Sequence, residues 1–370
     1  MNAVRQPTSG RRYLFDPFLF ACTIGLSLIS LLMLWGGKEE FGSRAFIMQL
    51  LMTVAGNAAV MVISAFDYEY IVEKYYVIIG IASAFFLAST VLFGMSIGTN
   101  RSWLDLGFVT IQPSEFVKAT YILTFAKHLS EVKETINQPK TLLRLGLHAG
   151  LFIGIVLATG DLGVALMYVG ITAVMLFCAG LSLWYFAAAI LIVVLVFPYA
   201  WDLLEHYQQQ RILVGFDPDL DPSDKGRQPI IGRQAIINGG LKGCGLYGGY
   251  YYTTLPIAES DFAFATVCEK FGFFGGFGIM VLMILAVVRI FYIAKQSRRD
   301  YGTYMCAGVA AMLVLQTLVN IGMCLAISPV IGITLPFISA GGSSVLATYI
   351  TLGLVHSVIT NKKRHIFEGK

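Results

Sequence analysis

The sequence has little charge. Only 13% of its 370 residues are Asp, Glu, Lys or Arg, whereas 56% are hydrophobic and the mean hydropathy is +0.72. Soluble domains are about 25% charged and about 45–50% apolar, and a single core stops growing near roughly 250–300 residues. The composition therefore excludes an ordinary cytosolic enzyme, a disordered chain and a basic nucleic-acid-binding protein. It predicts an all-α, polytopic membrane protein.

Cysteine is also scarce, with six residues and no Cys-x-x-Cys pair. Most of the six lie in apolar segments, and only Cys244 falls clearly in a polar loop. This pattern predicts small hydrophobic side chains rather than a disulfide framework or a zinc site. The sequence carries no Walker motif, haem site or metal cluster. Its function must therefore depend on the few charged and glycine-rich segments.

Ten apolar segments are long enough to cross a bilayer, which takes about 20 residues. The fourth is the weakest, because it contains Glu115, Lys118 and Lys127. The predicted spans are 15–35, 45–66, 75–94, 113–130, 141–159, 162–180, 184–201, 261–294, 302–327 and 335–360.

The distribution of Lys and Arg tests this topology. Of the basic residues assigned to a side, 16 fall on the side of the two termini and 8 on the other, while Lys118 and Lys270 are assigned to neither. Five of those eight lie in one long loop, where the positive-inside rule counts weakly. We therefore expect about ten spans with both termini cytoplasmic, forming a single integral membrane domain over residues 1–370. The first apolar run lacks a small-residue cleavage site, so no cleavable signal peptide is expected.

Residues 202–260 form the one large predicted extracytoplasmic loop, between spans seven and eight. It contains an acidic run at 217–224 and a glycine-rich stretch at 239–250. Pro and Gly at this density predict turns and bound backbone rather than a folded domain. A flexible loop and an ordered lid over a site both fit this composition.

The ionisable residues near the membrane converge on the outer face. Asp261 opens span eight and Glu269 follows two turns later, while Glu115 and Lys118 begin span four and Asp161 joins spans five and six. Intramembrane charges are functional candidates by default. Each also has a structural interpretation, since the i, i+3 pair can neutralise itself and both aspartates can cap helices.

Two further polar features lie at the same face. Asn320 is a polar residue inside span nine, and the segment 328–344 combines two prolines with Ser-Ala-Gly-Gly-Ser-Ser. This pattern predicts a broken helix entry whose backbone N–H groups favour an anion such as pyrophosphate; a packing kink fits equally well. The residues alone are consistent both with an enzyme that acts on a lipid-linked substrate and with a transporter.

Several motifs resemble one known family along nearly the whole chain. They are 101–107 (Arg-Ser-Trp-Leu-Asp-Leu-Gly), 112–115 (Gln-Pro-Ser-Glu) with Lys118, 161–163 (Asp-Leu-Gly), 207–211 (Tyr-Gln-Gln-Gln-Arg), 239–243 (Gly-Gly-Leu-Lys-Gly), 261–264 (Asp-Phe-Ala-Phe) with Glu269 and Gly272, 319–322 (Val-Asn-Ile-Gly), and 335–343 with its Pro336 and Ser-Ala-Gly-Gly-Ser. On these residues the chain is similar to the SEDS family, which includes RodA, FtsW and SpoVE.

The resemblance implies a ten-span peptidoglycan glycosyltransferase of the bacterial plasma membrane. Such an enzyme polymerises lipid II at the outer face, releases undecaprenyl pyrophosphate and works with a class B penicillin-binding protein. By resemblance, Asp261 is the expected general base, with Glu115 and Lys118 as further catalytic residues. The expected substrate-binding residues are Arg101, Trp103, Asp161, Arg211, Glu269, Asn320, Ser339, Gly341, Gly342 and Ser343. A divalent cation requirement stays open, and no cofactor is otherwise implied.

The sequence departs from the family pattern at a few positions. Gly160 stands where Pro is usual, Glu259-Ser260 replace a His-Thr-like pair, and Ala340 stands where Tyr is usual. A lipid II flippase and a weakly active scaffold for a penicillin-binding protein are the alternative functions. The flippase is disfavoured because the candidate residues gather at one face and the two halves show no repeat.

Overall fold

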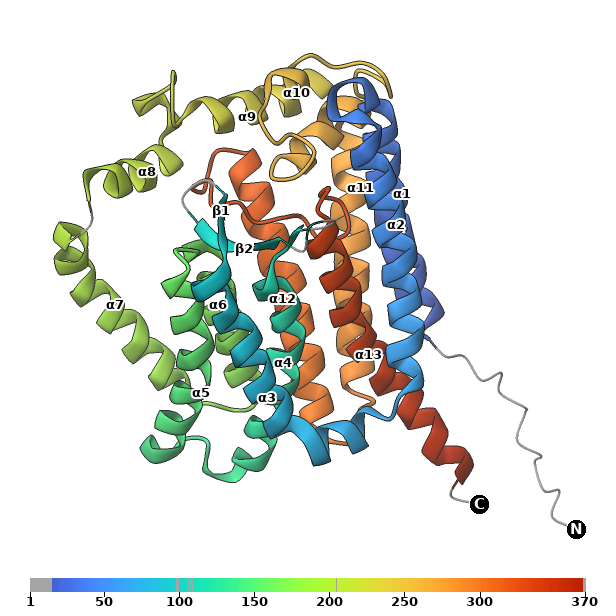
Figure 1. The fold of residues 1–370 in the computed structure, drawn as a ribbon, viewed down its shortest axis with the longest axis vertical. Coiled ribbons are helices and arrows are strands. Elements are labelled where there is room, and N and C mark those ends of the chain that lie inside the picture. The colour runs from blue at the N-terminus through green and yellow to red at the C-terminus, as the bar shows by residue number, and fades with distance from the viewer. Residues whose placement is uncertain (1–14, 98–99, 106, 108–109, 204, 369–370) are drawn as a thin grey trace, which may run out of the picture.

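The structure is a computed structural model that describes residues 15–97, 100–105, 107, 110–203 and 205–368. In this part of the chain, ten helices of 17 residues or more form one elongated bundle (Figure 1). They are α1 (Pro17–Gly36), α2 (Lys38–Ala65), α3 (Tyr68–Phe93), α4 (Pro113–Glu131), α5 (Pro139–Ala158), α6 (Leu162–Cys178), α7 (Leu183–Leu203), α11 (Ala263–Ala294), α12 (Asp300–Cys324) and α13 (Gly342–Glu368).

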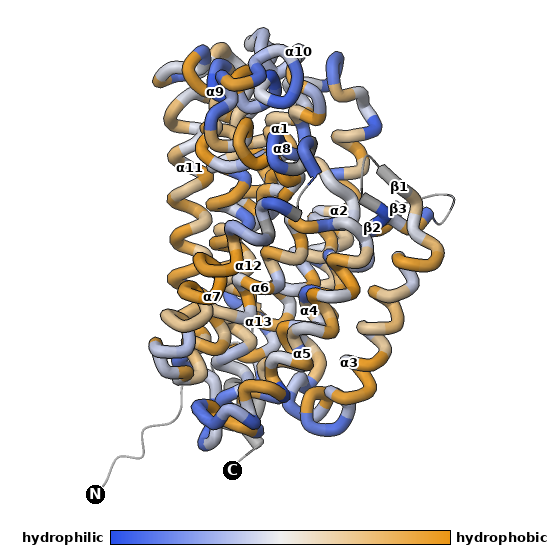
Figure 2. Tube along the Cα trace, turned by 90° about the vertical axis from the view of Figure 1, so that its left-hand side faces the viewer, coloured by the Kyte–Doolittle hydropathy of each residue, from blue (hydrophilic) through white to orange (hydrophobic). Residues whose placement is uncertain are grey.

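Each long helix falls on one predicted span, which confirms the all-α, polytopic fold. Seven of them are long and apolar enough to cross a membrane by length and composition: α1, α2, α3, α5, α11, α12 and the described part of α13. Helices α6 and α7 are shorter apolar helices, and α4 carries charges. Figure 2 shows hydrophobic residues concentrated in the middle of the bundle and hydrophilic residues at both ends, as a bilayer requires.

The connecting segments mark the two ends of the bundle. The start of α1, the end of α13 and the α4–α5 link, which contains the 3₁₀ turn η1 (Lys133–Thr135), lie at one end (Figure 1). The opposite end carries the short helices α8 (His206–Phe216), α9 (Arg227–Gly239) and α10 (Tyr251–Thr254), with η2 (Pro218–Leu220) between the first two. Under the expected topology, the latter is the outer end.

Helices α4, α12 and α13 are the most buried. Prolines and aspartates stand at the start of several helices. Pro113 occupies the first turn of α4 and Pro139 that of α5, where a missing N–H costs nothing. Asp16 caps α1 by accepting a hydrogen bond from Leu19 N at 3.0 Å. Helix α7 differs from the others, since its side chains are almost all exposed and it stands away from the bundle (Figure 1).

Two local elements differ from the sequence prediction. A three-stranded antiparallel sheet, which the all-α pattern does not predict, links α3 to α4: β1 (Met95–Ile97), β2 (Asn100–Asp105) and β3 (Thr110–Ile111). Span ten was predicted from residue 335, but α13 begins only at Gly342. The preceding segment is irregular because Pro329 and Pro336 cannot donate backbone hydrogen bonds and Gly332 has φ +69°.

The outer loop between α7 and α11 contains the short helices α8, α9 and α10 in addition to the predicted turns and bound backbone, which form its glycine-rich stretch. Its glycine-rich part packs against a break in α11 at Gly272, which has φ +68°. Cys244 N donates to Glu269 O at 2.9 Å, and Phe273 N donates to Gly240 O at 2.8 Å. The broken helix and the loop therefore supply each other with backbone hydrogen bonds.

Two buried side chains of α11, Glu269 and Lys270, bind this loop. Both carboxylate oxygens of Glu269 are occupied: Oε1 accepts from Asn238 Nδ2 at 2.8 Å and from Tyr250 N at 2.8 Å and Tyr251 N at 2.9 Å, while Oε2 accepts from Tyr252 N at 2.7 Å. The carboxylate therefore caps α10. The predicted substrate-binding role of Glu269 does not fit this geometry, since the residue is 0% exposed.

Lys270 binds the same loop on the other side. Its Nζ donates to the carbonyl oxygens of Leu246 at 3.2 Å and Gly36 at 3.3 Å, and it lies 3.8 Å from the ring centroid of Tyr252. The cation thus joins the end of α1 to the loop by charge-assisted bonds and a cation–π contact.

Removing the Glu269 carboxylate should release this loop. In Glu269→Ala, four donors lose their shared acceptor, so we expect the free energy of unfolding to fall by roughly 2–4 kcal/mol. Limited proteolysis should then cut within residues 239–256. The matched control is Lys242→Ala, an exposed position in the same stretch, which should leave the cleavage pattern unchanged. Equal protease resistance of the two variants would contradict the assigned role.

Candidate functional site

The outer end of the bundle contains a cleft of about 530 Å³. Trp103 of β2 and Gly341, Gly342 and Ser343 at the start of α13 line it, so four of the predicted substrate-binding residues meet there. Glu259, two residues before the expected base, lines it as well. Helix α13 begins at the cleft with Gly342 and Ser343. Because the first N–H groups of a helix have no intrahelical partner, a helix start at this place favours an anionic ligand.

Arg44 of α2 lines the same cleft, and the sequence reasoning missed it. It lies two residues after Gly42, whose φ of +77° kinks the start of α2. In the sequence, Arg44 is a lone arginine at the outer end of a predicted span. The distribution of Lys and Arg used it only to assign the topology. Its position brings a cation into a cleft whose other charged lining residue is Glu259.

Asp261 lies beside this cleft and is only partly buried. It does not cap α11, because the cap residue is Phe262 and no side chain makes the cap bond. Its Oδ1 accepts a hydrogen bond from Ser260 Oγ at 2.8 Å, and Oδ2 has no hydrogen-bond partner among the described residues. Desolvation raises the pKa of the Asp261 carboxyl above its ordinary value; the Ser260 hydrogen bond lowers it and the Glu259 charge raises it.

The backbone that carries Asp261 is held by the irregular segment before α13. Ala340 N donates to Glu259 O at 2.8 Å, and Ser339 Oγ donates to Ser260 O at 2.6 Å. Asn320 Nδ2 donates both to Asp261 O at 2.9 Å and to Ile333 O at 2.8 Å. Three successive carbonyls are therefore fixed by three different donors.

Asn320 and Ser339 were predicted to bind substrate, but the hydrogen bonds that they donate go to backbone carbonyls. Asn320 is 0% exposed and Ser339 is 1% exposed. The same Ser339 hydroxyl also accepts from Leu335 N at 2.8 Å. The geometry therefore gives both residues a positioning role beneath Asp261.

Glycines join the Asp261 region to the start of α6. A Cβ at Gly163 would come within 2.7 Å of Ile331 O, so only glycine permits this close approach. On the other side of the segment, a Cβ at Gly332 would lie 3.5 Å from Asp261 Oδ2. Residues 331–333 thus separate Asp261 from the Asp161–Gly163 turn.

Asp161 acts as the N-cap of α6 and also as a link to α4. Its Oδ1 accepts from Val164 N at 3.1 Å, and its Oδ2 accepts from Gln112 Nε2 at 3.1 Å. Desolvation by burial raises the pKa of this carboxyl, with the nearby Glu115 charge adding to it. The capping interpretation is therefore observed. Gln112 N in turn contacts Ser343 Oγ at 3.4 Å, which connects this turn to the cleft.

Glu115 and Lys118 form a buried ion pair in the first turns of α4. Lys118 Nζ lies 2.7 Å from Glu115 Oε1, and the residues are 1% and 5% exposed. The expected mutual neutralisation is thus observed, and removing one partner of such a pair typically costs about 3–5 kcal/mol. Glu115 Oε2 has no hydrogen-bond partner within the described chain. This burial favours a positioning role over direct contact with substrate.

The two predicted arginines lie in different elements. Arg101 of β2 is exposed; its N donates to Thr159 O at 2.9 Å and its Nε to Gly94 O at 2.8 Å. Much of its guanidinium is thus used to anchor the sheet to α3. Arg211 lies in α8, and its side chain is outside the described part of the structure.

The sequence departures have local structural consequences. Gly160 has φ +80°, a conformation that proline cannot adopt because its ring fixes φ near −65°. Ala340 lines the cleft, so the cavity is wider than a tyrosine at this position would leave. The described residues contain no group of three or more His, Cys, Asp or Glu side chains that could hold a metal ion.

Comparison with known proteins gives consistent results. A family model described as a cell cycle protein, covering FtsW, RodA and SpoVE, matches residues 12–364. Peptidoglycan glycosyltransferase MrdB of Escherichia coli K12 is 31% identical over 355 residues, 94% of each chain. Stage V sporulation protein E of Bacillus subtilis 168 is 32% identical over 356 residues, 93% of this chain and 96% of that protein.

A solved structure has the same architecture. It is a chain of a peptidoglycan synthase complex in which polymerization and crosslinking are structurally coordinated. The TM-score is 0.81 at 27% sequence identity, over 94% of this chain and 98% of the other.

Replacing Asn320 tests the positioning of Asp261. In Asn320→Leu, the buried carbonyls of Asp261 and Ile333 lose their donor, so the free energy of unfolding should fall by roughly 2–4 kcal/mol. The matched control is Gln316→Leu, one turn earlier on α12, where a buried Oε1 already lacks a partner among the described residues and removal should cost little. Thermal unfolding in detergent distinguishes them. Equal destabilisation by both variants would refute the assignment.

Proposed function

This chain belongs to the FtsW, RodA and SpoVE family, and we propose that Asp261 is the general base with which it polymerises lipid II. It is a multi-pass peptidoglycan glycosyltransferase of the bacterial inner membrane. The observation that carries the assignment of Asp261 is its carboxylate, which among the described residues is bound by Ser260 alone and pairs with no cation, two residues after Glu259 of the cleft lining. Asp161 and Glu269 are engaged by capping hydrogen bonds, and Glu115, although its Oε2 also lacks a described partner, is neutralised by Lys118.

The proposed reaction is an inverting glycosyl transfer. The 4-hydroxyl of the acceptor GlcNAc attacks the anomeric carbon of the donor chain, a new C–O bond forms, and the bond to undecaprenyl pyrophosphate breaks. The hydroxyl proton passes to the carboxylate of Asp261. A base within hydrogen-bond reach typically contributes about 10²–10⁴-fold to such a step.

The start of α13 is the proposed site for the leaving pyrophosphate. Its first-turn N–H groups border the cleft that Arg44 also lines, and both features stabilise developing negative charge. Trp103 provides an aromatic wall in the same cleft, which suits a sugar ring.

Glu115, Lys118 and Asp161 stabilise the elements that border the cleft. Gln112 connects Asp161 to Ser343 at the cleft, and the ion pair fixes the helix on which Gln112 is the cap residue. The catalytic role expected for Glu115 and Lys118 is therefore proposed to be indirect.

A penicillin-binding protein is the proposed partner. The similar solved chain comes from a complex that coordinates polymerization with crosslinking, and a transpeptidase is the enzyme class that crosslinks glycan strands. Lipid II and membrane lipid complete the proposed set of ligands. Co-purification of the full chain with a class B penicillin-binding protein tests this proposal.

Asp261→Asn should reduce glycan synthesis by about 10²–10⁴-fold while the protein stays folded, because the amide keeps the shape and loses the base. The measurement is polymer formed from labelled lipid II by the purified complex. Asp219→Asn, an exposed aspartate in the outer loop, is the control and should retain full activity. Full activity of Asp261→Asn would exclude the proposed base.

The pH profile gives a second test. A base is active as the carboxylate, so activity should fall as the pH drops through the raised pKa of Asp261. Ser260→Ala removes a hydrogen bond that favours the carboxylate and should move this acidic limb to higher pH. Glu259→Gln removes a neighbouring negative charge and should move it to lower pH. Shifts in the same direction, or none, would contradict the assignment.

A further inference from the structure

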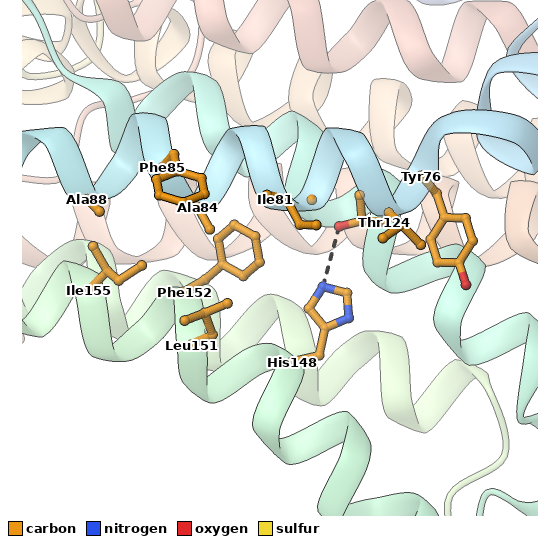
Figure 3. Close-up of a pocket in the computed structure, with 12 residues that line it drawn as sticks. Tyr76, Ile81, Ala84, Phe85, Ala88, Thr124, His148, Leu151, Phe152 and Ile155 are labelled. Carbon is orange, nitrogen blue, oxygen red and sulfur yellow. Dashed lines mark hydrogen bonds between the residues drawn. The ribbon is translucent and has the colours of Figure 1, made fainter.

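A second cavity lies on the opposite half of the bundle, outside the site described above. It is a groove of about 530 Å³ between α3 and α5, with α4 behind it (Figure 3). Gly80, Ala84 and Ala88 recur every fourth residue on α3, and this small-residue face keeps the groove open opposite Leu151 and Ile155 of α5. The proposed glycosyl transfer uses none of these residues.

The polar atoms deep in the groove are satisfied within the protein. His148 Nε2 lies 3.4 Å from Thr124 Oγ1 (Figure 3), and His148 Nδ1 lies 3.1 Å from His128 Nδ1. The hydroxyl of Tyr76 donates to Glu131 Oε2 at 2.9 Å. The remaining lining is apolar, so the groove suits hydrocarbon.

The dimensions distinguish between a lipid chain and a partner helix. From Tyr76 to Ala88 the groove follows α3 for about 18 Å, at ~1.5 Å per residue. One leaflet of the hydrocarbon core is about 15 Å thick. A helix about 10 Å wide and equally long would fill roughly 1,400 Å³, much more than the groove holds. A single acyl chain fits. Because the groove runs from residue 76 to residue 88 of a helix that spans Tyr68–Phe93, such a chain would reach past the middle of α3.

One end of the groove, at Tyr76 and His148, lies toward the helix ends where α3 and α5 begin and α4 ends. Each helix carries a cation on that side of its lining residues: Lys74, Arg144 and Lys127. Lys127 pairs with Glu131 at 3.3 Å, and Glu73 lies 3.6 Å from Arg299. Lys74 and Arg144 are exposed and make no ion pair with a carboxylate among the described residues.

We propose that this groove binds one acyl chain of an anionic phospholipid from the cytoplasmic leaflet, with its phosphate between Lys74 and Arg144. The apolar lining selects the chain. The headgroup charge is selected by Arg144 and Lys74, which have no carboxylate partner among the described residues, although Lys74 Nζ also donates to the Tyr70 hydroxyl at 2.9 Å. The site would be a lipid-binding site separate from the one that handles lipid II.

Native mass spectrometry of the full chain in detergent tests this proposal, with phosphatidylglycerol and phosphatidylcholine as probes. The wild type should retain one phosphatidylglycerol in preference to phosphatidylcholine. Ala84→Phe fills the groove and should lower retention of both lipids by about tenfold. Its control, Ile78→Phe, places the same ring on the exposed face of α3, where Ile78 is 63% exposed, and should retain the lipid.

A second pair of variants tests the charges without touching the apolar lining. Lys74→Gln combined with Arg144→Gln should remove the preference for phosphatidylglycerol, by roughly tenfold, and leave phosphatidylcholine retention unchanged. Lys295→Gln combined with Arg298→Gln removes the same charge from the α11–α12 link and should keep the preference. Unaltered phosphatidylglycerol binding in Ala84→Phe, or in the Lys74 and Arg144 double variant, would overturn the proposal.

Discussion

No backbone N–H or C=O group can remain unpaired at membrane depth, and the site of this protein depends on how that constraint is met. The irregular segment 325–341 interrupts the helical order between α12 and α13. It persists because Asn320, Ser339 and Ala340 pair its backbone with residues 259–261. The same bonds fix the carbonyls on either side of the Asp261 side chain. The hydrogen bonds that pair the backbone of the irregular segment therefore also position the proposed base.

Buried charge obeys a related rule, since each buried ionisable group needs a partner. Glu115 is paired with Lys118, Asp161 caps α6, and Glu269 caps α10. These partners stabilise the fold and leave such groups unsuited to accept a proton from substrate. Asp261 differs, because its only described side-chain bond comes from Ser260 and no cation pairs with it among the described residues, whereas Glu115, whose Oε2 is also free of a described partner, is neutralised by Lys118.

Much of this was predictable from the sequence. Apolar segment length located the long helices, and Pro113 correctly marked the start of α4. The convergence of Trp103 and Gly341–Ser343 followed from motif resemblance. Three features were missed because they depend on tertiary contacts: Arg44 at the cleft, the sheet that Arg101 anchors, and the engagement of Glu269 by the loop. A charge near a membrane can stabilise structure or bind substrate, and only its partners distinguish the two.

Helix α4 contacts both the region of the cleft and the groove. Its outer end carries Glu115 and Lys118, and Thr124 in its middle borders the groove toward the opposite end. Nine residues separate Glu115 from Thr124, about 13.5 Å along the helix. Because α4 is one continuous and mostly buried helix over this distance, a lipid that fills the groove would pack against the same helix that positions Gln112 at the cleft. The proposed lipid site and the proposed catalytic site thus share one structural element.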